Sequence, residues 1–65
     1  MEDFQQRVVD EKTALDEKLT KLNAFFGGAV FNKLDAAEQD RMARQCDAMT
    51  AYSKILGERI AAFKG

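Results

Sequence analysis

One glycine pair, Gly27-Gly28, divides this 65-residue chain, which contains no proline. Glycine and proline are the strongest interruptions of regular structure, so this pair is the main break that the sequence imposes. Apolar residues recur on both sides of it at steps of three, four or seven, the spacing of one helix face. The first series is Phe4, Val8, Leu15, Leu19, Leu22 and Phe26, and the second is Met42, Met49, Leu56, Ile60 and Phe63, with Cys46 and Ser53 in the intermediate turns. The pattern predicts two long helices.

The expected helix ends carry recognisable capping residues. Asp3 is placed to cap the first turn, with Gln6 three positions later as in a capping box. Gly27 suits the left-handed position that follows the last turn of a helix. Asp35, followed by Glu38, repeats the capping pattern at the start of the second helix. Each helix then spans roughly 23 to 28 residues, or about 35 to 42 Å.

The short connector makes the two helices antiparallel neighbours. Residues 28–34 of this connector are apolar enough to form a short helical turn that covers the end of the hairpin. The antiparallel register places Phe4 opposite Ile60 and Val8 opposite Leu56. The expected fold class is therefore all-α, a helical hairpin with a short helical connector, in a single domain over residues 1–65.

A two-helix hairpin has only one shared seam, so a monomer of this size is marginal. The apolar residues expected to lie off the seam are Val9, Phe25, Ala51 and Ile55. One cysteine and no histidine exclude an internal disulfide and a structural zinc site, two common supports of small domains. Association with further copies remains, and we predict a symmetric homo-oligomer.

Net charge and hydropathy limit the compartments and the binding partners that this protein can have. Ten Lys and Arg against eleven Asp and Glu give a net charge of −1, unlike the basic stripe of a duplex-binding protein. The longest uncharged run, residues 22–32, is far shorter than the ~20 apolar residues that cross a bilayer. The acidic start of the chain does not resemble a signal peptide. We expect a cytoplasmic protein that binds neither duplex nucleic acid nor a membrane.

The inventory of reactive side chains argues against catalysis. Without histidine, acid–base chemistry needs a tuned carboxylate, lysine, tyrosine or cysteine. Cys46 lies on the apolar stripe and is interpreted as a small buried hydrophobe. The carboxylates are not clustered as metal ligands, and the glycine pair lacks the spacing of a phosphate-binding loop. We predict that the chain is not an enzyme and uses no metal or cofactor.

A polar step interrupts the first apolar stripe. Between Val8 and Leu15 the stripe should continue at positions 11 and 12, which are Glu11 and Lys12. Because buried polar groups are costly without partners, the step needs an explanation. The residue spacing favours a structural explanation, in which Glu11 and Lys12 form polar contacts with each other or with Tyr52. Such a network would fix the register of the two helices.

The alternative explanation is a polar pocket between subunits. Arg7, Lys12 and Arg59 would then face an anionic ligand, while the ring of Tyr52 would stack on a base. Both explanations place the polar step opposite Tyr52 and Ser53 of the second helix.

Three further features have a simple structural interpretation, and for two of them a second interpretation remains open. Glu17 and Lys21 have the i,i+4 spacing of a surface ion pair. Met42 and Met49 fit core filling first and a groove for a partner helix second. Gly57 costs about 1 kcal/mol relative to alanine inside a helix, which a close approach would explain and simple tolerance would explain equally.

Several stretches of the chain resemble a known group of proteins. They are FQQRVVDEK at 4–12, LDEKLTKL at 15–22, MTAYSKILGERI at 49–60, and the shorter segments 31–34 and 38–39. Together they resemble a family of short helical-hairpin proteins encoded by bacteriophages, and that group is similar to the nucleotide sponges of phage anti-defence. Such sponges bind cyclic nucleotide or cyclic ADP-ribose-type signals of CBASS or Thoeris systems and hold them without cleavage.

The resemblance implies a ligand held where protomers meet, in the cytoplasm of a host bacterium. Phosphates would contact Arg or Lys, and bases would contact an aromatic or methionine face. The positions carried over from the resemblance are Arg7, Lys12, Lys18, Tyr52 and Arg59, and Glu11 of the polar step completes the candidate ligand-binding set.

A different class of function remains open from the sequence. The chain would then be a small coiled-coil-like module that binds or inhibits a host protein through exposed apolar residues. The candidates for that strip are Phe25, Val30 and Phe31.

Overall fold

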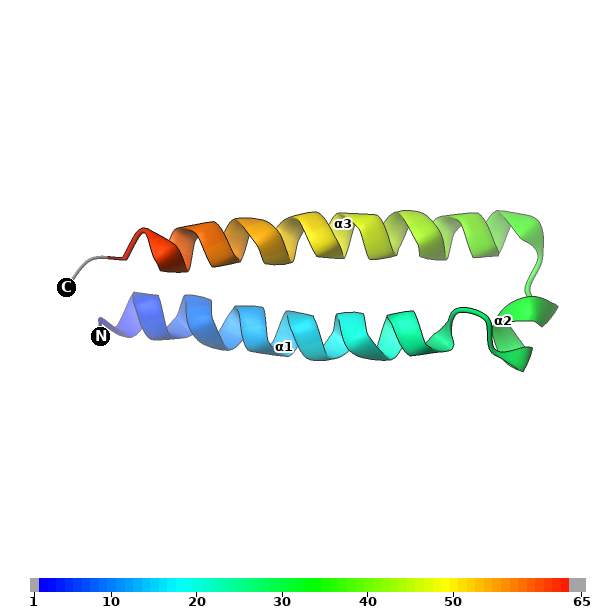
Figure 1. Cartoon of the computed structure of the whole chain (residues 1–65), viewed down its shortest axis with the longest axis horizontal. Helices are drawn as coiled ribbons and strands as arrows, with labels where there is room; N and C mark the ends of the chain where they lie inside the picture. The colour runs from blue at the N-terminus through cyan, green and yellow to red at the C-terminus, as the bar shows by residue number, and fades with distance from the viewer. Residues whose placement is uncertain (1, 64–65) are drawn as a thin grey trace.

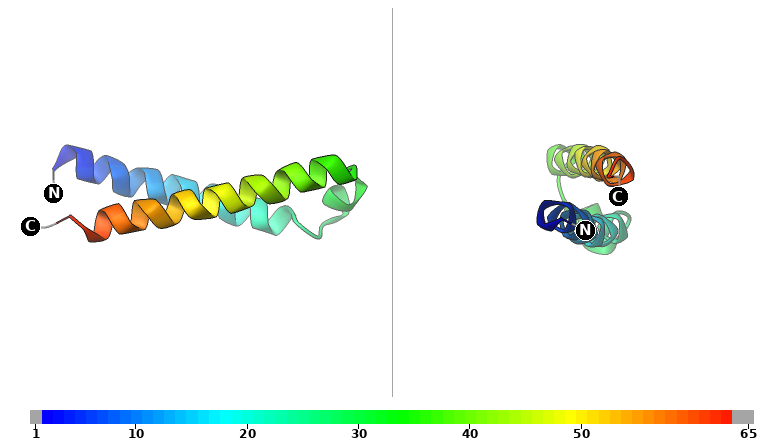
Figure 2. Two further views of the ribbon diagram at one scale, coloured as in Figure 1. Left: turned by 90° about the horizontal axis from the view of Figure 1, so that it is seen from above. Right: turned by 90° about the vertical axis from the view of Figure 1, so that its left-hand side faces the viewer.

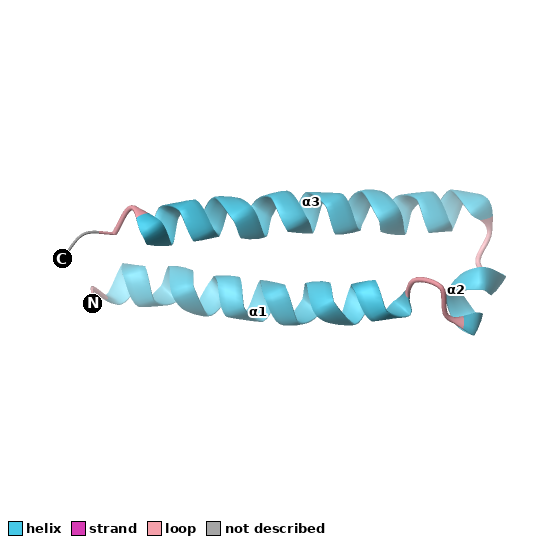
Figure 3. Cartoon of the chain, viewed as in Figure 1, coloured by secondary structure: helices cyan, strands magenta, loops and turns pink. Residues whose placement is uncertain are grey.

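The computed structural model describes residues 2–63, which form three helices. These are α1 (Asp3–Phe25), α2 (Ala29–Lys33) and α3 (Ala36–Ala61) (Figure 1). The start of α1 and the end of α3 lie at one end of the molecule, and α2 closes the other end. Short loops make the connections, and no strand occurs within the described residues (Figure 3).

The two long helices pack along their length in an antiparallel hairpin that measures 49 × 15 × 13 Å. Figure 2 shows that they lie one above the other and cross at a shallow angle. The predicted all-α helical hairpin with a short helical connector is confirmed. None of the helices within residues 2–63 is long and apolar enough to cross a membrane.

The first helix begins one residue earlier than its predicted cap. Glu2 is the N-cap, and its backbone N–H donates to Oε1 of Gln5 at 3.0 Å. Asp3 is already helical, so the prediction that it caps the helix is wrong. The expected partner Gln6 instead donates its side-chain amide to Oδ1 of Asp10 at 2.9 Å, one turn further along α1. Glu2 and Gln5 have the same three-residue spacing, so the capping box is retained with its position shifted by one.

The other two predicted helix boundaries are confirmed. Gly27 has φ +81°, the left-handed conformation that lets the chain leave α1 without a clash from a Cβ atom. Asp35 is the N-cap of α3, and its Oδ1 accepts the backbone N–H of Glu38 at 2.8 Å. This bond satisfies one of the free donors of the first turn.

Aromatic packing and one glutamine fix the closed end of the hairpin. The ring of Phe31 on α2 meets Phe25 edge-on at 6.2 Å between centroids and Phe26 at 4.8 Å. From α3, Nε2 of Gln39 donates to the carbonyl oxygens of Phe31 at 2.9 Å and of Leu34 at 3.2 Å. The connector is therefore held by both long helices.

The core of the hairpin is thin. Among residues 2–63 only Val8, Ser53 and Leu56 are buried, and Leu56 alone has no exposed surface. At the open end, Phe4 packs edge-on against Phe63 at 5.9 Å, yet 59% of Phe4 stays exposed. The rest of the two apolar stripes is half-buried, as expected for helices that share one seam.

Residues predicted to lie off the seam divide into two groups. Ile55 and Ala51 are exposed in the single chain, Ile55 by 54%. Val9 and Phe25 are half-buried, in the case of Phe25 because Phe31 packs against its ring. A single hairpin therefore exposes large apolar side chains on α3.

Candidate ligand-binding site

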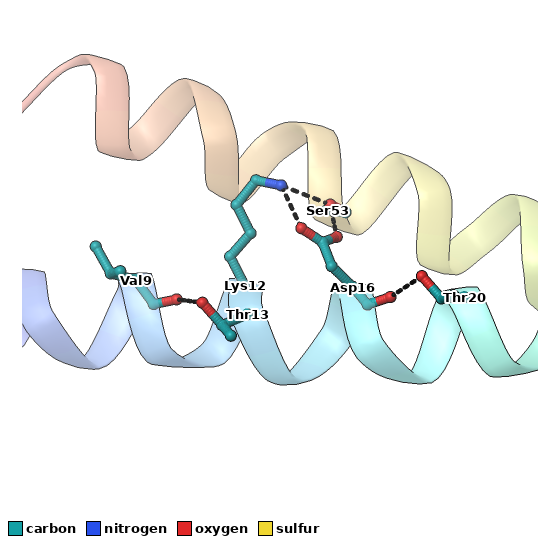
Figure 4. A network of polar contacts seen from close by, with 6 residues as sticks. All are labelled: Val9, Lys12, Thr13, Asp16, Thr20 and Ser53. Atoms are coloured by element: carbon teal, nitrogen blue, oxygen red, sulfur yellow. Dashed lines mark hydrogen bonds and ion pairs between the residues drawn. The ribbon is translucent and has the colours of Figure 1, made fainter.

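The polar step of α1 forms a three-residue network with α3 (Figure 4). Nζ of Lys12 donates to Oδ2 of Asp16 at 2.7 Å and to Oγ of Ser53 at 3.0 Å. The hydroxyl of Ser53 donates in turn to Oδ1 of Asp16 at 2.5 Å. The three side chains thus close a ring in which the ammonium, the carboxylate and the hydroxyl all have partners.

The network lies in the most tightly packed part of the hairpin. Val8 is one turn before Lys12 on α1, and Leu56 is next to Gly57 on α3. A Cβ atom on Gly57 would lie 3.3 Å from Cε of Lys12, so the glycine makes room for the lysine stem. Of the two interpretations of Gly57, the close approach applies.

The network also changes the acidity of its carboxylate. The hydrogen bond from Lys12 lowers the pKa of Asp16, and the hydrogen bond from Ser53 lowers it further, against a smaller opposing effect of burial. Both bonds favour the charged carboxylate over the neutral acid. Asp16 is therefore the anion that balances Lys12 within the chain.

The partners of Lys12 differ from those that the sequence suggested. Ser53 lies opposite Lys12, as the register predicted, but Glu11 and Tyr52 are exposed. Successive helix residues are rotated by about 100°, so Glu11 points away when Lys12 points into the seam. Asp16 is four residues on and shares the face of Lys12. That i,i+4 spacing was the signal that could have identified it.

The remaining candidates lie on the surface of the single chain. Arg7, Tyr52 and Arg59 are exposed, with 44% of Tyr52 accessible, while Lys18 is exposed further along α1. Lys18 is the one member of the six-residue set that lines a groove between the helices.

This groove lies between the closed-end halves of α1 and α3 and has a volume of about 470 Å³. Its lining residues are Lys18, Lys21, Leu22 and Phe25 from α1, with Met42, Gln45 and Met49 from α3. Of these residues only Lys18 belongs to the predicted ligand-binding set, and the sequence had offered Met42 and Met49 as a groove for a partner helix. The signal was present, because 18, 21, 22 and 25 share one helix face, as do 42, 45 and 49.

The two lysines of the groove have no carboxylate partner within residues 2–63. The ion pairs of this part of the chain join Lys12 to Asp16, Arg41 to Glu38 and Arg44 to Asp40. The expected pair between Glu17 and Lys21 is not among them, so that prediction is wrong. Over the same residues, no three His, Cys, Asp or Glu side chains gather as metal ligands.

Comparison with known proteins identifies the relatives of this hairpin. The chain is 36% identical over 61 residues to a protein of Enterobacteria phage T4 described as "Uncharacterized 7.5 kDa protein in denB-rIIB intergenic region". The alignment covers 94% of this chain and 95% of the phage protein. No solved structure matches this chain. The sequence model of the Sequestin family matches residues 2–62, nearly the whole hairpin. The chain therefore belongs to the Sequestin family.

Proposed function

We propose that this chain is a phage anti-defence protein that binds a cyclic nucleotide immune signal and sequesters it without cleavage. The signal is of the cyclic oligonucleotide or cyclic ADP-ribose type, as made by CBASS or Thoeris systems, in the cytoplasm of the host. Membership of the Sequestin family carries the proposal, since the family name denotes sequestration. The similarity to a phage T4 protein supports the phage context.

The proposal places the ligand where subunits of a homo-oligomer meet. Among residues 2–63 three buried side chains make a thin core, and the exposed Phe4, Tyr52 and Ile55 supply apolar surface that a second copy can cover. Covering apolar surface stabilises an assembly by about 25 cal/mol per Å² removed from water. This supports self-association independently of any ligand.

The candidate ligand contacts are the exposed cations and the exposed tyrosine. Arg7, Lys18 and Arg59 offer guanidinium and ammonium donors to phosphates, and Tyr52 offers a ring to a base. Glu11 and Lys12 are less available, because Glu11 is acidic and Lys12 already donates to Asp16 and Ser53. Two of the three N–H groups of Lys12 are thus in use, and the carboxylate of Asp16 would repel a phosphate that approaches the third.

A thermal-shift panel tests the function. The ligands are cyclic dinucleotides, cyclic trinucleotides and cyclic ADP-ribose isomers, with the mass of the protein assembly measured alongside. A ligand that binds only the folded state stabilises by RT ln(1 + [L]/Kd), about 2.7 kcal/mol at a hundredfold excess over Kd. One class should raise the melting temperature by several degrees and be recovered chemically intact. A flat panel contradicts sequestration of these signals, and recovery of a cleaved product contradicts a non-enzymatic role.

A second candidate function is a module that binds or inhibits a host protein. The exposure of Val30, 59% on the outer face of α2, favours it. The other two residues of the expected strip, Phe25 and Phe31, are half-buried against each other, which leaves that strip small. Recovery of one stoichiometric host protein from a pull-down, lost in Val30→Asp and unaffected by nucleotides, would favour this candidate over sequestration.

A further inference from the structure

We propose that the groove between α1 and α3, lined by Lys18, Lys21, Phe25, Met42 and Met49, binds one ring and one phosphate group of a nucleotide. The inference rests on the proposed function and gives it a location. A nucleotide has an anionic phosphate group and a flat apolar ring, and the groove contains side chains that match each of them.

The anionic half is matched by two lysines on one edge. Lys18 and Lys21 are three residues apart on α1, so their ammonium groups share a face, and like charges at this spacing destabilise a helix by a few tenths of a kcal/mol. Within residues 2–63 neither lysine pairs with a carboxylate. A phosphate between them relieves the repulsion and gains two charge-assisted contacts.

The ring of the nucleotide is matched by the apolar side chains that line the groove. Phe25, Leu22, Met42 and Met49 surround the hollow, and methionine sulfur packs favourably against ring edges. Phe25 is held in place by the edge-on contact with Phe31, so its ring does not have to be ordered when a ligand arrives. The volume of about 470 Å³ falls within the range of small-molecule sites.

A polar group within the groove provides for recognition of a base. The side-chain amide of Gln45 makes only a long contact with Sδ of Met49, at 3.8 Å. Its carbonyl oxygen and its second N–H group are therefore available to the polar edge of a base. The groove thus combines cations, an apolar floor and an amide, which is the mixture that a nucleotide requires.

A second copy of the chain is a poorer occupant of this groove. In a two-fold contact the same surface meets itself, so one interface would contain four lysines, two copies each of Lys18 and Lys21. The like charges would oppose that contact. The strongly exposed Ile55 and Tyr52 of α3 are outside the groove lining and offer an uncharged surface for assembly.

The position of the groove also limits how the other predicted ligand-binding residues can contact the nucleotide. Lys18 and Arg7 are about 16 Å apart along the α1 axis at 1.5 Å per residue. A nucleotide held at Lys18 is therefore out of reach of Arg7 in the same chain. Arg59 is likewise about 15 Å from Met49 along the α3 axis, so Arg7 and Arg59 would contribute from a neighbouring chain, which agrees with a ligand held between subunits, whereas Tyr52 is only three residues from Met49 and lies beside the groove.

Methionine methyl NMR combined with matched lysine variants tests the groove in the full chain. The ligand is the cyclic nucleotide that gives the largest thermal shift in the panel, with pyrophosphate and adenosine as probes of its two halves. The variant is Lys18→Gln with Lys21→Gln, and the control is Lys33→Gln with Lys54→Gln. Both pairs remove two positive charges, and glutamine has nearly the helix propensity of lysine.

The expected result is that the methyl signals of Met42 and Met49 move on titration. The groove variant should bind about tenfold more weakly or worse, the loss expected for a contact to a charged group. The control variant should bind like the wild type. Pyrophosphate and adenosine should each bind far more weakly than the whole nucleotide.

Other outcomes overturn the inference in distinguishable ways. A nucleotide that binds tightly without moving either groove methionine, and equally well to the groove variant, places the site elsewhere and leaves sequestration standing. If the Met42 and Met49 signals move on dilution of the ligand-free protein as its mass falls, a second copy occupies the groove. A flat nucleotide panel removes the proposed function, and the assignment of the groove fails with it.

Discussion

Cε of Lys12 on α1 lies directly against the backbone of Gly57 on α3, 3.3 Å from where a Cβ atom would be. Because the ammonium of Lys12 is held by Asp16 and Ser53, its stem cannot move aside without disturbing those bonds. The glycine and the lysine are therefore coupled across the seam.

This coupling is measurable with a double-mutant cycle. Gly57→Ala gains about 1 kcal/mol of helix propensity, but in the wild type it also pushes on Lys12. In a Lys12→Ala background the obstacle is gone. We expect Gly57→Ala to raise the free energy of unfolding by about 1 kcal/mol in that background and by less in the wild type. Urea denaturation at one fixed protein concentration measures both, and equal gains in the two backgrounds would show that the residues are independent.

The lowered pKa of Asp16 predicts a pH dependence of stability. Since the folded carboxylate is the stronger acid, its contribution is full above its ordinary pKa of 3.8 and is lost as the pH falls through its lower folded value. The wild type should be more stable than Asp16→Asn from neutral pH down to about 4, and the difference should shrink below 3.8. Urea titrations at a series of pH values follow this difference.

The control for this experiment is Asp47→Asn, an exposed position outside the network. Its stability difference from the wild type should lack the pH-dependent decrease predicted for Asp16. A difference between wild type and Asp16→Asn that stays constant down to pH 2.5 would mean that the carboxylate of Asp16 is not preferentially stabilised in the folded protein.

The closed end of the hairpin depends on Phe31. Phe31→Ala removes the ring that packs against Phe25 and Phe26, and for a half-buried aromatic we expect a loss of about 2 kcal/mol. Val30→Ala, on the exposed face of the same short helix, should change stability by no more than about 0.5 kcal/mol. Thermal unfolding monitored by circular dichroism compares them. An equally large loss for Val30→Ala would indicate that another chain covers the outer face of α2.

Self-association should depend on the exposed apolar surface of α3. Ile55→Asp places a charge where 54% of an isoleucine is exposed, so we expect the assembly to dissociate and the melting temperature to fall. Thr50→Asp introduces the same charge elsewhere on the exposed surface of α3 and should keep the wild-type mass. Sedimentation velocity over a hundredfold range of concentration is the measurement. A wild-type protein that stays monomeric over this range would refute the proposed oligomer.

The positions of the two long helices, and much of the way they face each other, follow from local sequence signals. Gly27 ends α1, and Asp35 begins α3, because left-handed φ and N-cap hydrogen bonds are properties of a few adjacent residues. The spacing of the apolar stripes predicted that Lys12 lies opposite Ser53, which is confirmed, but it also placed Phe4 opposite Ile60, where the structure instead packs Phe4 against Phe63. The exact start of α1 was missed, because Glu2 with Gln5 satisfies the same capping pattern as Asp3 with Gln6.

The contacts of the polar residues in the seam depend on how the two helices pack against each other. The i,i+4 spacing already puts Asp16 beside Lys12, but it is the packing of α3 that brings Ser53 to both of them and leaves Glu11 and Tyr52 exposed. The groove that holds Lys18 and Lys21 likewise exists only where the two helix surfaces meet. Helix periodicity gives the face on which a side chain lies, but distances between faces depend on how one helix is rotated and displaced against the other.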